Sequence, residues 1–316
     1  MKRLVVTRRL PPAVEARAAR DYDALLNAGD MPRADIPALC AGAAALLCCP
    51  ADRIDAAVVA ALPDSVRVVG TFSVGTDHLD LPALHARGIA VVNTPDVLSV
   101  ATAELTMLLI LAAARRAGEG ERLLRAGRWG GWAPTQLLGT QVSGRRLGIL
   151  GMGRIGREVA RMAAAFGMAV HYRNRGRLAR GLERGATFHA ADETFLPQCE
   201  VLSLHAPGGL GTRHWLDAAR IAQLPRGAIV ANAARGTLVD DAALVAALRS
   251  GQVAAAGLDV YEGEPRVHPD YLALENVVLL PHLGSATVAT RDAMGFAALD
   301  GIDAALARRK AVNRVR

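Results

Sequence analysis

Three closely spaced glycines mark a place where a phosphate group could bind. Gly151, Gly153 and Gly156 form a G-x-G-x-x-G pattern that follows the apolar run 147–150 and opens a helical stretch. The first glycine permits a tight turn, the second lets backbone N–H groups approach a pyrophosphate, and the third lets helix and strand pack closely. The helix start, at Arg154 and Ile155, adds partial positive charge. In this context the pattern predicts a dinucleotide-binding loop rather than a simple tight turn.

The residues after the next apolar run bear on which dinucleotide binds. Asn174 lies 18 residues after Gly156, between Arg173 and Arg175. This is close to the ~20-residue spacing at which a carboxylate usually binds the ribose of NAD. A neutral amide between two guanidiniums favours a 2′-phosphate instead, because the planar fork of arginine matches phosphate. We therefore expect NADP(H) as the preferred cofactor and NAD(H) as the alternative. The competing interpretation of these residues is a solvated basic turn that binds no ligand.

Four further apolar runs end in unusual polar residues. These residues are His205 after run 201–204, Asn232 and Arg235 after run 228–231, Asp259, Glu262 and Glu264 after run 255–258, and His282 after run 277–280. Taken singly, each is most simply explained as part of a hydrogen-bonded turn. In open α/β sheets, however, ligands bind beyond the carboxyl ends of the strands. A cation, a carboxylate and an imidazole at one such edge predict a catalytic site.

Short apolar runs and helical stretches alternate along the chain, which favours parallel sheets covered by helices. In the first part we expect strands at 3–6, 44–49, 66–71 and 90–93, and helices at 14–26 and 54–61. A long helix at 99–116 and an irregular segment at 127–139 precede the second series. Its strands are expected at 147–150, 169–172, 201–204, 228–231, 255–258 and 277–280. A last helix, 290–307, is expected to pack against the first series.

Composition limits the class of protein. A length of 316 residues predicts about two domains, and 52% hydrophobic residues exclude intrinsic disorder. The longest apolar stretch, 105–114, is shorter than the ~20 residues that cross a bilayer. The apolar run 4–6 is too short for the apolar region of a signal peptide, so we expect none. We therefore expect a cytoplasmic protein without a membrane partner. The sequence contains no C-x-x-C pair, so we expect no metal site.

The net charge of +7 could indicate nucleic acid or small anionic ligands as partners. The basic residues are scattered along the chain, and only four Tyr and five Phe could stack on bases. We expect no nucleic-acid partner.

Together these motifs resemble the D-isomer-specific 2-hydroxyacid dehydrogenases. The segments that carry the resemblance are 74–77, 93–95, 148–156, 235–236, 257–265 and 280–287. Within that family, Trp129-Gly130-Gly131-Trp132-Ala133-Pro134 is most similar to the glyoxylate/hydroxypyruvate reductases. The resemblance covers nearly the whole chain and implies two Rossmann/flavodoxin-like doubly wound parallel-sheet domains with an interdomain cleft. Residues 1–98 plus 287–316 would form a discontinuous substrate-binding domain, and residues 99–286 the NAD(P)-binding domain.

The resemblance also implies an activity, the NADPH-dependent reduction of glyoxylate or hydroxypyruvate, with Arg235, Glu264 and His282 as the catalytic residues. His282 would donate the proton, because imidazole titrates nearest to neutral pH. Glu264 would orient the ring and favour the imidazolium form. Arg235 would bind the substrate carboxylate and polarise the carbonyl group.

Further contacts follow from the same resemblance. Backbone N–H groups of Val74 and Gly75 would bind the substrate carboxylate, and Ser285 would touch substrate. Asp259 is expected at the nicotinamide amide. The other implied cofactor contacts are Thr102, His205, Pro207, Thr212, Ala233 and Gly284. A homodimer is expected, and Trp132 has two interpretations: a packing residue of its own segment, or a residue that closes the partner's active site.

Two alternatives stay open at this point. The substrate could be another 2-oxo acid, of the 2-ketogluconate or phosphoglycerate type. The chain could also be a non-catalytic, dinucleotide-sensing binding protein. The set of Arg235, Glu264 and His282 argues against the sensor, because a sensor needs no proton donor.

Overall fold

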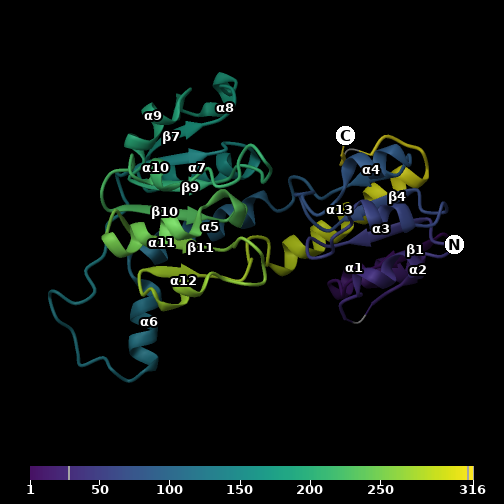
Figure 1. Ribbon diagram of the computed structural model, residues 1–316, viewed down its shortest axis with the longest axis horizontal. Helices are drawn as coiled ribbons and strands as arrows, with labels where there is room; N and C mark the ends of the chain where they lie inside the picture. Colours follow the sequence, from purple (N-terminus) through teal and green to yellow (C-terminus); the bar gives the residue numbers. More distant parts are fainter. Residues whose placement is uncertain (28, 312, 316) are drawn as a thin grey trace. The chain divides into compact units, whose positions relative to one another are not determined.

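A computed structural model describes residues 1–27, 29–311 and 313–315. The chain divides into two units, Met1–Leu98 with Ser285–Arg316, and Ser99–Gly284 (Figure 1). These units place the second boundary two residues before the predicted one. Both contain parallel sheets with helices on their faces, which confirms the predicted fold class.

The sheet of the first unit has the strand order β13-β5-β4-β3-β1-β2. Its strands are β1 (Arg3–Val6), β2 (Asp23–Leu25), β3 (Ala45–Cys48), β4 (Val68–Thr71), β5 (Ala90–Val92) and β13 (Arg314–Val315). All pairs are parallel except β13 with β5. The order of β2-β1-β3-β4-β5 is the flavodoxin-like doubly wound order.

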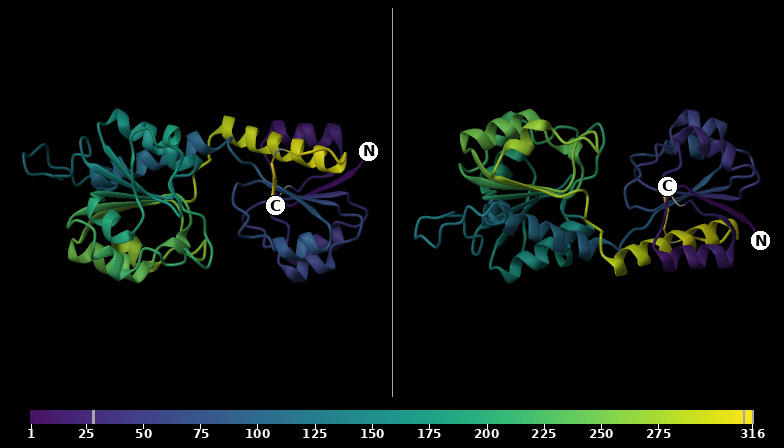
Figure 2. Two further views of the ribbon diagram at one scale, coloured as in Figure 1. Left: turned by 90° about the horizontal axis from the view of Figure 1, so that it is seen from above. Right: turned by 90° about the horizontal axis from the view of Figure 1, so that it is seen from below.

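Helices cover both faces of this sheet, so its central strands are continuous apolar runs. The helices are α1 (Pro12–Asp21), α2 (Ile36–Leu39), α3 (Ala56–Ala61), α4 (Leu81–Ala86) and α13 (Val288–Leu306). Figure 2 shows α1 and α13 side by side on one face and α3 and α4 on the other. A Cβ on Gly70 of β4 would lie 2.9 Å from Ile302 Cδ1, so α13 lies close to the strand. The last helix therefore packs on the first unit, as expected.

The expected helix at 14–26 is wrong in its second half. Helix α1 ends at Asp21, and Tyr22 is extended and buried. The next residues form β2, which pairs with β1 in the register Arg3↔Asp23. Residues 23–25 form a strand because they pair with β1, and the helical spacing of the apolar residues does not reveal that pairing.

The second unit has the strand order β12-β11-β10-β9-β6-β7-β8, all in parallel. Its strands are β6 (Arg146–Leu150), β7 (Ala169–Arg173), β8 (Thr187–His189), β9 (Val201–Leu204), β10 (Ala228–Asn232), β11 (Val253–Leu258) and β12 (Val277–Leu279). This is the order of a dinucleotide-binding doubly wound sheet, whose strand order reverses between β6 and β9.

Two hydrophobic cores lie on the two faces of this sheet. Helices α5 (Ser99–Ala114) and α7 (Arg154–Ala165) supply one core, and α10 (Ala218–Ile221) and α11 (Asp241–Ser250) the other. The remaining helices are α6 (Ala117–Arg125), α8 (Arg180–Glu183), α9 (Asp192–Phe195) and α12 (Pro269–Ala273). Across the described ranges, no helix combines the length and apolar character that crossing a bilayer requires.

Candidate active site

The glycine loop after β6 leaves room for a pyrophosphate. Gly151 has φ +89°, and a Cβ there would lie 2.5 Å from the backbone nitrogen of Ala206. A Cβ on Gly156 would lie 2.7 Å from the Gly151 carbonyl oxygen. Around Gly153, by contrast, the described residues leave open space, and α7 begins at the next residue, Arg154. The loop therefore presents the N-terminus of α7 and an accessible backbone, which fits a dinucleotide phosphate.

The end of β7 presents hydrogen-bond donors. The Met152 backbone N–H donates to Asn174 Oδ1 at 2.7 Å, which ties the amide to the glycine loop. Within the described residues the Asn174 NH2 group has no acceptor, and Arg175 is exposed without an ion pair. Arg173 was predicted to attract a 2′-phosphate, but its guanidinium contacts protein groups instead. Its Nε lies 3.2 Å from Asp192 Oδ1, and its Nη1 donates to the Asn174 carbonyl. Of the three predicted residues, Asn174 and Arg175 thus keep donors without a described acceptor.

His205 follows β9, next to the glycine loop. Its backbone N–H donates to the Leu150 carbonyl at 2.7 Å. The imidazole is buried, with Nε2 2.8 Å from Ser203 Oγ and Nδ1 without a partner among the described residues. Burial lowers the pKa of His205 to about 4, so the ring is neutral. Thr212 Oγ1 closes the following loop by donating to the Pro207 carbonyl at 2.7 Å.

The structure brings His282 and Glu264 together. His282 Nδ1 lies 2.8 Å from Glu264 Oε2, and the Tyr261 backbone N–H donates to Glu264 Oε1 at 3.0 Å. Burial raises the pKa of Glu264, but the hydrogen bonds from His282 and Tyr261 and the charge of Arg235 outweigh it, so this pKa lies below its usual range. An ionised carboxylate therefore holds Nδ1, and Nε2 has no partner among the described residues.

Arg235 is carried on a turn that packs against the loop of Glu264. Asn232 shapes this turn: its Nδ2 donates to the Arg235 carbonyl at 2.8 Å, and its Oδ1 accepts from the Ala234 N–H at 3.0 Å. A Cβ on Gly236 would overlap the backbone of Tyr261 and Glu262. The sequence places Asn232 among the polar residues at strand ends but gives it no individual role; asparagine at a strand end is typical of such a turn.

Asp259 holds the turn that carries His282. Its carboxylate accepts from the N–H groups of Leu283 at 2.6 Å and Gly284 at 2.8 Å, and its carbonyl accepts from the His282 N–H at 2.8 Å. His282 has φ +55°, a left-handed conformation that is costly for a residue with a side chain. Burial raises the pKa of Asp259, and the two backbone N–H groups offset this only in part. Asp259, predicted at the nicotinamide amide, thus also positions His282.

The other predicted cofactor contacts in this unit lie close to these groups. A Cβ on Gly284 would lie 3.4 Å from Asp259 Oδ2 and from Thr102 Cγ2, so three predicted residues meet there. Thr102 is buried at the start of α5, and Ala233 is buried directly after β10.

In the first unit, the loop after β4 has its carbonyl groups occupied. Asn93 Nδ2 donates to the Val74 carbonyl at 2.9 Å, and Ser73 Oγ donates to the Gly75 carbonyl at 2.6 Å. The N–H groups of Val74 and Gly75 have no acceptor in the described part of this unit. They can therefore bind an anion, as the sequence predicts.

Ser285 and Trp132 complete the predicted set. The Ser285 carbonyl accepts from Arg291 Nε at 3.2 Å. The Trp132 side chain is 82% exposed, so packing within its own segment does not account for it.

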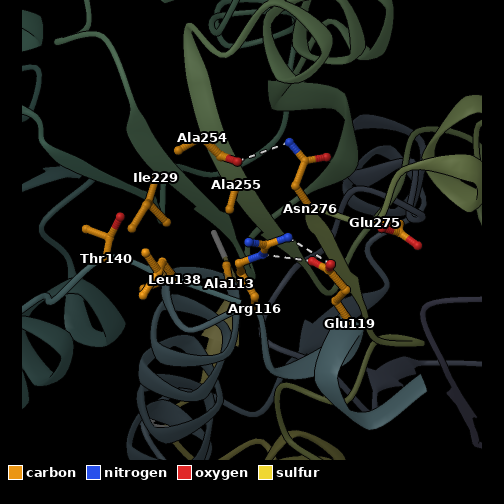
Figure 3. A pocket seen from close by; sticks show the side chains of 12 residues that line it. Ala113, Arg116, Glu119, Leu138, Thr140, Ile229, Ala254, Ala255, Glu275 and Asn276 are labelled. Carbon is orange, nitrogen blue, oxygen red and sulfur yellow. Dashed lines mark hydrogen bonds and ion pairs between the residues drawn. The ribbon is translucent and has the colours of Figure 1, made fainter. Parts of the chain in front are cut away.

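A cavity of about 330 Å³ lies elsewhere in the second unit (Figure 3). Ile229, Ala254 and Ala255 place it at the amino ends of β10 and β11, whereas the predicted residues follow the carboxyl ends. Two of its charged residues pair with each other, with Arg116 Nε and Nη2 each 2.8 Å from Glu119. None of the predicted site residues lines it. In the described ranges, no three side chains that could ligate a metal are grouped together.

Comparisons with known proteins agree with the motifs. The family model for the NAD binding domain of D-isomer specific 2-hydroxyacid dehydrogenases matches residues 107–284. A glycerate dehydrogenase from Hyphomicrobium methylovorum is 42% identical over 308 residues, covering 96% of this chain and 95% of the relative. A glyoxylate reductase from Thermococcus onnurineus is 42% identical over 255 residues, covering 79% and 76%.

A solved structure is similar over the same length. The NADPH-dependent glyoxylate/hydroxypyruvate reductase from Sinorhizobium meliloti, in complex with NADP and malonate, superimposes with a TM-score of 0.89. It is 33% identical and covers 99% of this chain and 96% of that one. The resemblance drawn from the motifs is thereby confirmed.

Proposed function

Because the chain belongs to the D-isomer specific 2-hydroxyacid dehydrogenases, we propose that it reduces glyoxylate or hydroxypyruvate to the 2-hydroxy acid with NADPH. The observation that carries the proposal is the 2.8 Å pair of His282 Nδ1 and Glu264 Oε2, next to the turn of Arg235. This arrangement provides a proton donor whose partner is ionised. A dinucleotide-sensing protein without turnover would have no use for it.

Each residue of the site has a role in this reaction. When bound, the reduced nicotinamide supplies the hydride for the carbonyl carbon. His282 donates a proton from Nε2 to the carbonyl oxygen, while Glu264 stabilises the imidazolium form and fixes the ring. Arg235 binds the substrate carboxylate and the carbonyl oxygen. Asp259 keeps His282 in its left-handed turn.

Residues outside these turns complete the proposed site. The N–H groups of Val74 and Gly75 bind the substrate carboxylate, which is favourable because no described residue of their unit accepts from them. Ser285 contacts the substrate. The cofactor contacts are Gly151, Gly153, Gly156 and the start of α7 for the pyrophosphate, with Thr102, Pro207, Thr212, Ala233 and Gly284 nearby in the proposed site.

The preference for NADPH rests on Asn174 and Arg175. Asn174 Oδ1 accepts from the Met152 N–H, whereas its NH2 group has no described acceptor and can donate to a ligand. N–H groups and a guanidinium suit a 2′-phosphate, whereas a ribose diol is usually bound by a carboxylate. The similar Sinorhizobium meliloti reductase is named as NADPH-dependent.

A kinetic panel tests the proposal. We expect glyoxylate and hydroxypyruvate to consume NADPH with a higher kcat/KM than 2-ketogluconate or a phosphoglycerate-type 2-oxo acid, and NADPH to have a lower KM than NADH. His282→Ala should lower kcat by about 10²–10⁴ and leave the Kd for NADPH, measured by fluorescence, unchanged. NADPH binding without turnover by the unaltered protein would support the sensor instead.

A further inference from the structure

A carboxylate lies beside the residues proposed to bind the 2′-phosphate. Strand β8 pairs with β7 so that Arg173, the last residue of β7, is opposite His189. Helix α9 begins three residues later at Asp192, whose side chain is 16% exposed. The carboxyl ends of neighbouring parallel strands lie at one edge of the sheet, so Asp192 reaches the group formed by Arg173, Asn174 and Arg175.

Asp192 holds two guanidinium groups at once. Its Oδ1 lies 3.2 Å from Arg173 Nε, and its Oδ2 lies 2.9 Å from Arg220 Nε. Arg173 also donates from Nη1 to the Asn174 carbonyl. The charge of Arg173 is therefore balanced by Asp192, and its guanidinium is directed toward this carboxylate.

From this geometry we propose that Asp192 is a specificity-determining residue that limits the preference for NADPH over NADH. A negative charge close to the subsite repels a 2′-phosphate and neutralises a guanidinium that would otherwise attract it. NADH has no 2′-phosphate, so its binding is nearly indifferent to Asp192. The inference rests on the proposed 2′-phosphate subsite at Asn174 and Arg175.

The variant Asp192→Asn tests the proposal, because it removes the charge and keeps the size. We expect the ratio of kcat/KM for NADPH to that for NADH to rise about fivefold over the unaltered protein, the scale of one unit charge about 4 Å away in bulk water. In calorimetry, adenosine 2′,5′-bisphosphate should bind tighter by a similar factor, whereas 5′-AMP should bind equally well. Both gains should shrink at high ionic strength.

Asp217→Asn is the matched control. Asp217 Oδ2 lies 2.8 Å from Nη1 of the same Arg220, but no described contact joins Asp217 to Arg173. Asp217 also caps α10 by accepting from the Arg220 N–H at 2.8 Å, and asparagine caps a helix equally well. The cofactor ratio should therefore stay unchanged in this variant. Asp192→Ser, with another residue suited to a helix start, repeats the test if Asp192→Asn does not fold.

The outcomes separate this proposal from the proposed function. An unchanged or lower ratio in the Asp192 variants overturns the role of Asp192, as does an equal rise in Asp217→Asn. An unaltered protein that prefers NADH refutes the proposed cofactor preference. It leaves the test of Asp192 intact, because each variant is compared with the unaltered protein.

Discussion

At the scale of single residues, the site depends on hydrogen bonds that fix the charge and direction of a few side chains. Glu264 accepts from His282 and from the Tyr261 backbone, and Asp259 accepts from two consecutive N–H groups next to His282. Hydrogen bonds to charged groups are worth more than neutral ones, about 1.5–3 kcal/mol each. These bonds can therefore hold His282 in a left-handed conformation that a side chain disfavours.

The pH dependence of reduction follows from this pair. In the proposed reaction Glu264 acts in its ionised form, and reduction of the carbonyl group consumes a proton. We therefore expect kcat to fall as pH rises. On the acid side, kcat should persist until the pH falls below the ordinary glutamate pKa of about 4.3, because the pKa of Glu264 is lowered. Profiles of kcat against pH at saturating substrate measure both limbs.

Glu264→Gln provides the comparison for that profile. It removes the carboxylate whose protonation produces the acid limb, so the fall in kcat at low pH should disappear. An acid limb at the same pH in both proteins would contradict the role of Glu264. The pair of His282 and Glu264 also contributes to the free energy of unfolding. This contribution is fully present above the ordinary pKa of glutamate and is lost as pH falls through the lowered pKa of Glu264.

At the scale of elements, the sequence predicts the strands that follow a local apolar pattern and misses the strands that depend on pairing with a distant segment. The strands of the second unit are near their predicted places because buried parallel strands are continuous apolar runs. Strands β8 and β13 were missed, and β2 was taken as helix. Each lies at or near a sheet edge, and each is short. Such segments become strands through their neighbours rather than through their own composition.

The candidate site also has features that the sequence predicts and features that only the fold reveals. Arg235, Glu264 and His282 follow apolar runs, so their place at strand ends was visible in the sequence. The ion pair of Arg173 with Asp192 joins residues of two different strand ends and has no local signal. The buried, neutral state of His205 likewise depends on packing that only the folded chain shows.

The turn residue before the C-terminal strand β13 yields a prediction about stability. Asn313 is buried, and its Nδ2 donates to the Asn93 carbonyl at 2.7 Å and to the Ala297 carbonyl at 2.9 Å. Asn313→Ala should lower the free energy of unfolding by about 1–3 kcal/mol, because two half-buried carbonyls lose a donor. Urea denaturation measures the change. Asn27→Ala is the control, since Asn27 donates to one carbonyl, that of Thr7, from a half-exposed position; an equal loss in both variants would contradict this account.

At the scale of the whole molecule, the exposed apolar side chains of residues 124–138 indicate a surface that binds another protein chain. Leu124, Trp129, Trp132 and Leu138 are 60%, 52%, 82% and 66% exposed. Large apolar groups gathered on one segment are typical of an interaction surface. We expect a second copy of the chain to cover them, with a mass in solution twice 33.1 kDa by light scattering.

Trp132 would connect the expected dimer to substrate choice. If Trp132 closes the partner's active site, Trp132→Ala should change the ratio of kcat/KM between hydroxypyruvate and glyoxylate severalfold and leave the KM for NADPH unchanged. Trp129→Ala is the matched control, because Trp129 lies in the same segment and its Nε1 donates to Gln136 Oε1 at 3.2 Å. Equal ratios in both variants and the unaltered protein, or a monomer in solution, would rule out this role. A change confined to Trp132→Ala would indicate that one chain completes the site of the other.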